Sequence, residues 1–193
     1  QGQMSSVRVV DTSRNWAERR LLLGSLLGAT TTCELIAANK AVSYADAAPS
    51  LGLVRASDIK VTVAPGEPWD PNQLRKAERA AMPDLFNPDG MRQLEPAPFQ
   101  VRVRYRCETP SCPGHEPKLL DWETGQAGRK WLLTNPRDRV PQMLRDKYER
   151  LLSPTNDVHL YVGNLHLHRT SFSALGVWSA KPTAADAYDG ALF

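Results

Sequence analysis

The segment "RYRCETPSCPGHE" constrains the fold more than any other, because it sets two cysteines and a histidine close together as Cys107-x4-Cys112-x2-His115. Thiolates and imidazoles at such spacing hold zinc when the loop bends them into a tetrahedral cage. Pro113 and Gly114 supply bends between the last two ligands. The segment therefore predicts a metal site, and structural zinc is the favoured interpretation.

A structural zinc site needs four protein ligands, and this segment supplies three. Either His168 or His166 could be the fourth ligand, and His166 is the favoured one. It alternates with leucines, as His168 does, so both histidines would project from one face of an extended segment. Cys33 is a further candidate, although a cysteine early in a helix is more often simply buried. A catalytic zinc with water in the fourth position, or free and oxidisable thiols beside a hydrogen-bonded histidine, are the open alternatives.

The residues before the first cysteine alternate between apolar and basic side chains, which predicts a strand over 99–107. Arg102, Arg104 and Arg106 would then share one face. At the strand rise they would lie roughly 6.6 Å apart, close to the spacing of successive phosphates. The pattern favours a surface for a polyanion. The alternative is that acidic neighbours across the sheet pair with these arginines.

The charge distribution supports the same interpretation. Residues 101–150 contain eleven Lys/Arg and seven Asp/Glu, so the positive excess of this chain, +3 overall, is concentrated there. His168 and Arg169 are added to the predicted nucleic-acid-binding residues. Three aromatic residues could stack on bases, although a core position is the better prediction for the tryptophans; they are Trp122, Trp131 and Tyr161.

The main alternative function is a metal-dependent hydrolase or nuclease. Asp121 and Glu123 flank a tryptophan, Lys130 follows seven residues later, and His166 could join them. Nucleases of the restriction type place an acidic residue and a lysine two positions apart on one strand, and this spacing departs from that. Asp121 and Glu123 are more simply interpreted as the acidic start of a helix.

The order of expected elements predicts an α+β fold, with a helical N-terminal part followed by a mainly antiparallel sheet with packed helices and a Cys/His metal loop. Helices are expected to begin at Thr31, Asp70 and Pro141, the last burying Leu144 and Tyr148. The expected strands cover 59–63, 99–107 and the stretches "VHLYVG" and "SALGVW" near the end. The segment before residue 59 is expected to be a loop, and 82–98 an irregular connection.

This order suggests a helical region over 4–97, which could belong to the same domain as the rest, an α+β domain over 98–182 and a flexible tail over 183–193. The chain ends in Leu192-Phe193, which resembles short peptides that dock in the groove of the bacterial sliding clamp. A third function is therefore an interaction subunit of a larger bacterial complex, using this tail and the leucine-rich first helix.

Composition excludes some classes of protein. No apolar run approaches the eighteen or so residues of a membrane span, and three cysteines do not make a secreted disulfide scaffold. The expected location is the cytoplasm.

One set of motifs, "YRC…C-x-GH…DWE…YVGN-x-H", resembles a pattern in an uncharacterised family of bacterial proteins. The resemblance covers roughly the second half of the chain and implies neither an activity nor a substrate. The leading prediction remains a nucleic-acid-binding module with structural zinc, in a bacterial DNA-processing or defence system. The matching residues are Tyr105, Arg106, Cys107, Cys112, Gly114, His115, Asp121, Trp122, Glu123, Tyr161, Val162, Gly163, Asn164 and His166.

Overall fold

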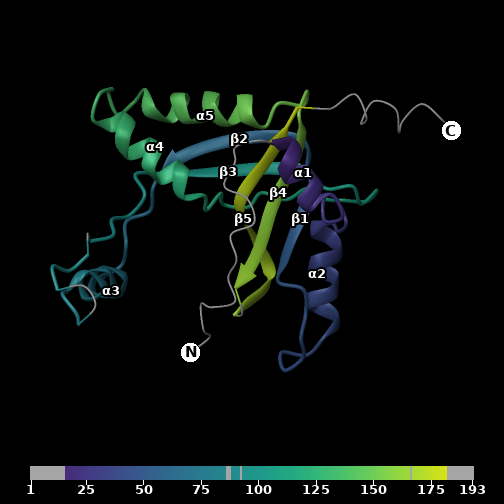
Figure 1. Cartoon of the computed structure of the whole chain (residues 1–193), viewed down its shortest axis with the longest axis horizontal. Helices are drawn as coiled ribbons and strands as arrows, with labels where there is room; N and C mark the ends of the chain where they lie inside the picture. Colours follow the sequence, from purple (N-terminus) through teal and green to yellow (C-terminus); the bar gives the residue numbers. More distant parts are fainter. Residues whose placement is uncertain (1–15, 86–87, 92, 166, 182–193) are drawn as a thin grey trace.

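The structure, a computed structural model, describes residues 16–85, 88–91, 93–165 and 167–181. In this part of the chain, helices are interspersed with strands, and the strands form two antiparallel sheets (Figure 1). The predicted α+β class is confirmed. The predicted C-terminal tail, with Leu192-Phe193, lies outside the described residues.

The larger sheet contains β1 (Leu51–Arg55), β4 (Asp157–Leu165) and β5 (His168–Ala180), in the order β1-β4-β5. The second sheet pairs β2 (Ser57–Pro65) with β3 (Phe99–Arg106), and the two sheets cross in Figure 1. Each sheet takes strands from both sides of residue 97. The segments before and after that residue therefore build one pair of sheets together.

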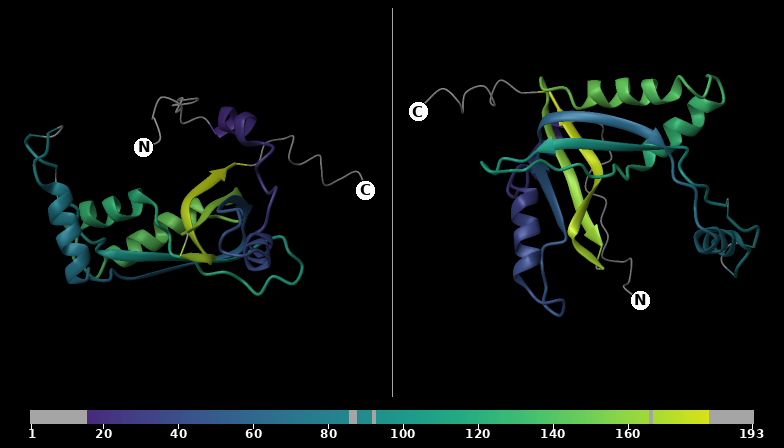
Figure 2. Two further views of the ribbon diagram at one scale, coloured as in Figure 1. Left: turned by 90° about the horizontal axis from the view of Figure 1, so that it is seen from below. Right: turned by 180° about the vertical axis from the view of Figure 1, so that it is seen from behind.

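The helices occupy different sides of these sheets. Helices α4 (Trp122–Leu132) and α5 (Val140–Leu151) lie along the two-stranded sheet, and α1 (Trp16–Leu23) and α2 (Thr32–Ala41) lie beside the larger one (Figure 1). Helix α3 (Pro71–Ala81) stands apart from both sheets in Figure 1 and in the right view of Figure 2. No helix in the described segments is long and apolar enough to cross a membrane.

Two helix starts predicted from capping residues are confirmed. Thr31 accepts a hydrogen bond from the backbone N–H of Glu34, whose side chain accepts one from the N–H of Thr31 in return. Asp70 and Gln73 make the same reciprocal pair at the start of α3. Each pair satisfies backbone donors that a helix start leaves without partners, so each fixes where its helix begins.

The prediction of a loop before residue 59 is wrong, because Leu51–Arg55 forms β1 and pairs with β4. Gly52 is the reason that the sequence did not indicate this strand. A Cβ atom at this position would lie 2.7 Å from Cδ1 of Leu35 on α2, closer than real contacts allow. The glycine therefore permits a helix to pack closely on the strand, although in the sequence it is typical of a turn.

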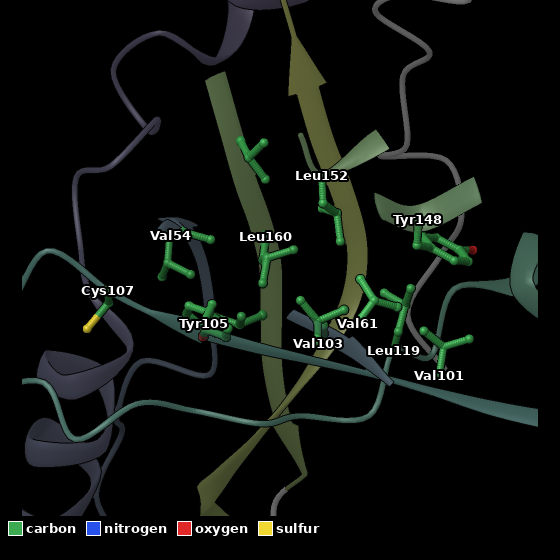
Figure 3. Close-up of a cluster of buried hydrophobic side chains, with 14 of the residues drawn as sticks. Val54, Val61, Val101, Val103, Tyr105, Cys107, Leu119, Tyr148, Leu152 and Leu160 are labelled. Atoms are coloured by element: carbon green, nitrogen blue, oxygen red, sulfur yellow. The ribbon is translucent and has the colours of Figure 1, made fainter. Parts of the chain in front are cut away.

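The main core lies between the inner face of β3 and the elements that cover it (Figure 3). Val101, Val103 and Tyr105 are at most 1% exposed, as the alternation predicts. Leu144 and Tyr148 of α5 are fully buried, which confirms the predicted inner side of that helix. Trp122, for which a core position was favoured, is 75% exposed at the start of α4, so that prediction is wrong.

A short extended segment, residues 115–120, joins the two sheets. On one side it pairs with β3, through Tyr105 with His115 and Arg102 with Lys118. On the other side Leu119 pairs with Ala174 of β5. The loop that carries the cysteines and the histidine therefore leads directly into the connection between the sheets.

His159 on β4 is a buried titratable residue of this framework. It is 1% exposed, and neither ring nitrogen has a hydrogen-bond partner in the described structure, although Nδ1 lies 3.5 Å from Oδ1 of Asp157. Burial lowers the pKa of His159 below its usual 6.5, with Asp157 opposing the shift and Arg55 adding to it. The imidazole is therefore neutral in the folded protein at neutral pH.

We expect this residue to make the protein less stable in acid. As the pH falls below about 6.5, the unfolded chain binds a proton at His159 that the folded chain does not, so the free energy of unfolding falls until the lower folded pKa is reached. Urea unfolding at about pH 7 and about pH 5 measures the loss, which should be smaller in His159→Gln. Equal losses in the two proteins would contradict the assignment, and the comparison cancels effects of acid on other groups.

Candidate metal centre and basic face

Four side chains from three parts of the chain meet at one point, and their ligand atoms all lie within 4.8 Å of one another. Cys33 comes from the first turn of α2, Cys107 from the end of β3, and Cys112 and His115 from the loop that follows. Among the described residues this is the only such group of potential metal ligands. The group, called the Cys/His cluster below, could hold a metal ion.

The distances within the Cys/His cluster are those of ligands around a small ion. Nε2 of His115 lies 3.3 Å from Sγ of Cys112, 3.5 Å from Sγ of Cys33 and 3.6 Å from Sγ of Cys107. The sulfurs of Cys33 and Cys107 are 3.6 Å apart, much farther than a disulfide bond. Tetrahedral zinc with its usual bond lengths separates two sulfurs by about 3.8 Å, and a sulfur and a nitrogen by about 3.6 Å.

Local structure holds each ligand in place. The capping pair at Thr31 fixes the start of α2 and therefore Cys33, two residues later. His115 exchanges two backbone hydrogen bonds with Tyr105, of 2.8 and 2.9 Å. Gly114 has a φ of +90°, a conformation that favours glycine, and its N–H donates to Sγ of Cys112. The loop thus turns Cys112 and His115 back toward the end of β3.

The surroundings of Cys107 favour its thiolate form. Burial alone would raise the pKa of Cys107, but hydrogen bonds with the Thr109 side chain, with the backbone of Thr109 and Cys33, and with His115 lower it to about 5. Burial and the two neighbouring cysteines raise the pKa of Cys33 to about 12. Adjacent thiols cannot all ionise without a cation between them, so full ionisation of the Cys/His cluster requires a bound metal.

The structure thus brings the three ligands predicted from the loop together with Cys33, the further candidate, and not with His168. His166, the favoured fourth ligand, lies outside the described residues, and its role stays a prediction. The capping box that contains Cys33 was the available signal, because it fixes the position of this cysteine in the first turn of a helix. What the sequence did not contain was the docking of that helix against the loop.

The predicted arginines lie on the face of β3 opposite the core. Their partners on β2 are Thr62 for Arg102, Lys60 for Arg104 and Ser57 for Arg106, so no acidic residue stands opposite them. In the part of the chain described here, Arg104, Arg106 and Lys60 form no ion pair. The basic face is defined here by Lys60, Arg102, Arg104, Arg106 and Lys118.

Two predicted nucleic-acid-binding residues lie elsewhere. His168 is exposed at the start of β5. The guanidinium of Arg169 donates to the backbone carbonyls of Ser43 and Asp46, at 2.8 and 2.9 Å, and lies over the ring of Tyr44. These contacts connect β5 to the segment after α2, so Arg169 is not included in the basic face.

Three residues predicted to catalyse hydrolysis lie at the start and in the last turn of helix α4. Asp121 is its N-cap and accepts a hydrogen bond of 3.0 Å from the N–H of Glu123, which confirms the interpretation of these residues as a helix start. Glu123 pairs with Lys147 of α5 at 3.7 Å, and Lys130 is exposed in the last turn of α4. The hydrolase stays a prediction, with loss of cleavage in Asp121→Asn as its test.

The third predicted function involves the leucines of the first helix. Leu21 is 87% exposed and Leu22 is 51% exposed, while Leu23 packs against a small cluster around Trp178. Their exposure leaves apolar surface beside the larger sheet. The function as an interaction subunit stays a prediction, because its other half, the tail, is not described.

The fold and the site define a class: an α+β protein with two crossed antiparallel sheets joined beside a cluster of three cysteines and a histidine. The model of a protein family described as a domain of unknown function, DUF8757, matches residues 28–191, and the chain belongs to that family. The expected resemblance to an uncharacterised family is confirmed to that extent. No curated protein and no solved structure matches the chain.

Proposed function

We propose that this protein binds nucleic acid through the basic face, and that structural zinc in the Cys/His cluster holds that face in place. The observation that carries the proposal is the cross-strand pair of Lys60 and Arg104. Like charges directly opposite each other in a sheet destabilise it. A row of phosphates would remove that repulsion and match the spacing of the arginines.

The ligand set supports zinc over other metals. Three thiolates and one imidazole suit a soft or borderline ion in tetrahedral geometry, whereas magnesium and calcium prefer oxygen ligands. A closed set of four protein ligands is typical of a structural rather than a catalytic site. Zinc would tie the start of α2 to the end of β3, where the arginines lie.

Binding by this face should depend steeply on salt. Each phosphate neutralised by a cation contributes about 0.9 to the slope of log affinity against log salt for duplex DNA, and about 0.7 for a single strand. Arg104→Ala should therefore weaken binding several-fold at roughly 0.1 M salt. It should also reduce the slope of log affinity against log salt by the amount that corresponds to about one phosphate contact. Fluorescence anisotropy with a labelled oligonucleotide over a salt series measures both quantities.

Arg79→Ala is the matched control, because Arg79 is an exposed arginine on α3, away from the basic face. It removes the same charge and should leave affinity nearly unchanged. Equal losses in the two variants would point to a general effect of net charge. Unchanged binding in a folded Arg104→Ala protein would remove the basic face from the proposal.

A further inference from the structure

A hollow lies at the end of the basic face where β3 begins. Its volume is about 350 Å³, and it is called the Trp69 hollow here. Ligand pockets in proteins start at roughly 300 Å³, so it can take one small group. The residues of its lining that matter are Trp69, Gln73, Phe99, Gln100, Lys118 and Leu120.

The lining of this hollow suits a flat aromatic ring with polar edges. Trp69 and Leu120 offer apolar surface, and Leu120 is 57% exposed although it follows a buried residue of the core. Gln100 adds an amide, which can both donate and accept hydrogen bonds. A nucleobase combines a face that stacks on aromatic side chains with edges that bond to amides.

The Trp69 hollow adjoins the cations of the basic face. Lys118 lines the Trp69 hollow and also a polar hollow of about 390 Å³ that contains Arg102, Thr170 and Ser171. Lys118 stands directly opposite Arg102 across the pairing of residues 115–120 with β3. Hydroxyls and cations of this kind bind phosphate oxygens. A nucleic-acid backbone whose phosphates contact the basic face would therefore bring a base to the Trp69 hollow.

Two acidic side chains of the described residues border this path: Glu116 lines the polar hollow and Glu67 lines the Trp69 hollow. Glu67 pairs with Lys118 at 3.0 Å, but the Glu67 side chain is 71% exposed. Exposed ion pairs contribute little to stability, so a phosphate can replace Glu67 as the partner of Lys118 at small cost.

We infer that the ligand of the basic face is a single-stranded nucleic acid, with one base held in the Trp69 hollow. The inference rests on the proposed function and adds the class of ligand to it. Bases in a duplex are paired and stacked inside the helix, and they cannot enter a side hollow without being unstacked. A single strand presents phosphates and free base faces together, and RNA and DNA share this chemistry.

The test compares four labelled probes of equal length with the full chain: single-stranded DNA, single-stranded RNA, a DNA duplex, and a DNA strand without bases. We expect one or both natural single strands to bind more tightly than the duplex. Stacking contributes about 1–3 kcal/mol per base, so Trp69→Ala should weaken binding of a natural strand roughly 5- to 150-fold. Binding of the strand without bases should not change.

A second variant tests the hollow in case Trp69→Ala disturbs the local structure. Leu120→Ser changes an exposed wall of the hollow and should also weaken only the strands with bases. Leu133→Ser is its control, because Leu133 is 84% exposed and does not line the hollow. Circular dichroism shows that each variant is folded.

The outcomes separate the two proposals. Tight binding of duplex and single strand alike, with no effect of Trp69→Ala or Leu120→Ser but a loss in Arg104→Ala, would overturn the inference and leave the proposed function intact. Binding of no probe even at low salt would overturn both. A preference for single strands that both hollow variants reduce would establish the inference.

Discussion

Cys112→Ser is expected to empty the Cys/His cluster of metal and to destabilise the fold. The thiol is 2% exposed, and its sulfur accepts from the N–H groups of Cys107 and Gly114. A serine hydroxyl keeps its proton at neutral pH and is a poor ligand for zinc. Plasma mass spectrometry should find about one zinc per wild-type chain and almost none in the variant.

The loss of stability should amount to several kcal/mol, since metal binding energy in small zinc domains is folding energy of roughly 10–16 kcal/mol. This chain has a core of its own, so the variant should unfold at lower temperature rather than fail to fold. Adding a strong chelator to the wild type should have a similar effect on the unfolding temperature.

Two further variants complete the experiment. Ser111→Ala changes an exposed residue in the same loop and should retain the metal. Cys33→Ser and His166→Ala separate the two candidates for the fourth ligand, because only the true ligand should weaken metal binding. If wild-type protein purified without chelator contains no metal, the Cys/His cluster is a set of free thiols and not a metal site.

Leu144→Ala should have the second large effect, a loss of about 2–5 kcal/mol in the free energy of unfolding. Leu144 is fully buried where α5 packs over the two-stranded sheet, and its Cδ1 lies 3.9 Å from the place a Cβ would take on Gly128 of α4. Truncation leaves a cavity between two helices and the sheet, which the close packing prevents from collapsing fully.

Urea unfolding measures the difference between this variant and the wild type. Leu85→Ala removes the same atoms from a leucine that is 90% exposed, and it should change stability by less than about 0.5 kcal/mol. A loss below 1 kcal/mol in Leu144→Ala would mean that α5 does not seal this part of the core.

Several elements could be predicted because short-range chemistry decides them. The capping boxes at Thr31 and Asp70 and the alternation along β3 depend on neighbours a few residues apart. β1 could not be predicted in this way, because its evidence is its pairing with β4, more than a hundred residues later. A strand that short has little pattern of its own.

The site shows the same division. Cys107, Cys112 and His115 lie within one loop, and their spacing indicates a metal site without any knowledge of the fold. Cys33 joins them only because α2 docks beside the loop, a contact between distant segments. The absence of acidic residues opposite Arg102, Arg104 and Arg106 likewise depends on which strand lies next to β3. A strand over 59–63 was expected, but its pairing with β3 could be identified only from the structure.

The position of Cys107 directly after β3 has a consequence for strand register. In a strand, a slip of one residue turns every side chain to the opposite face. Here such a slip would bury three arginines and expose Val101, Val103 and Tyr105. The first ligand after the strand would then be displaced from the other three. A bound metal would therefore select the one alignment of β3 in which the core is apolar and the outer face is positive.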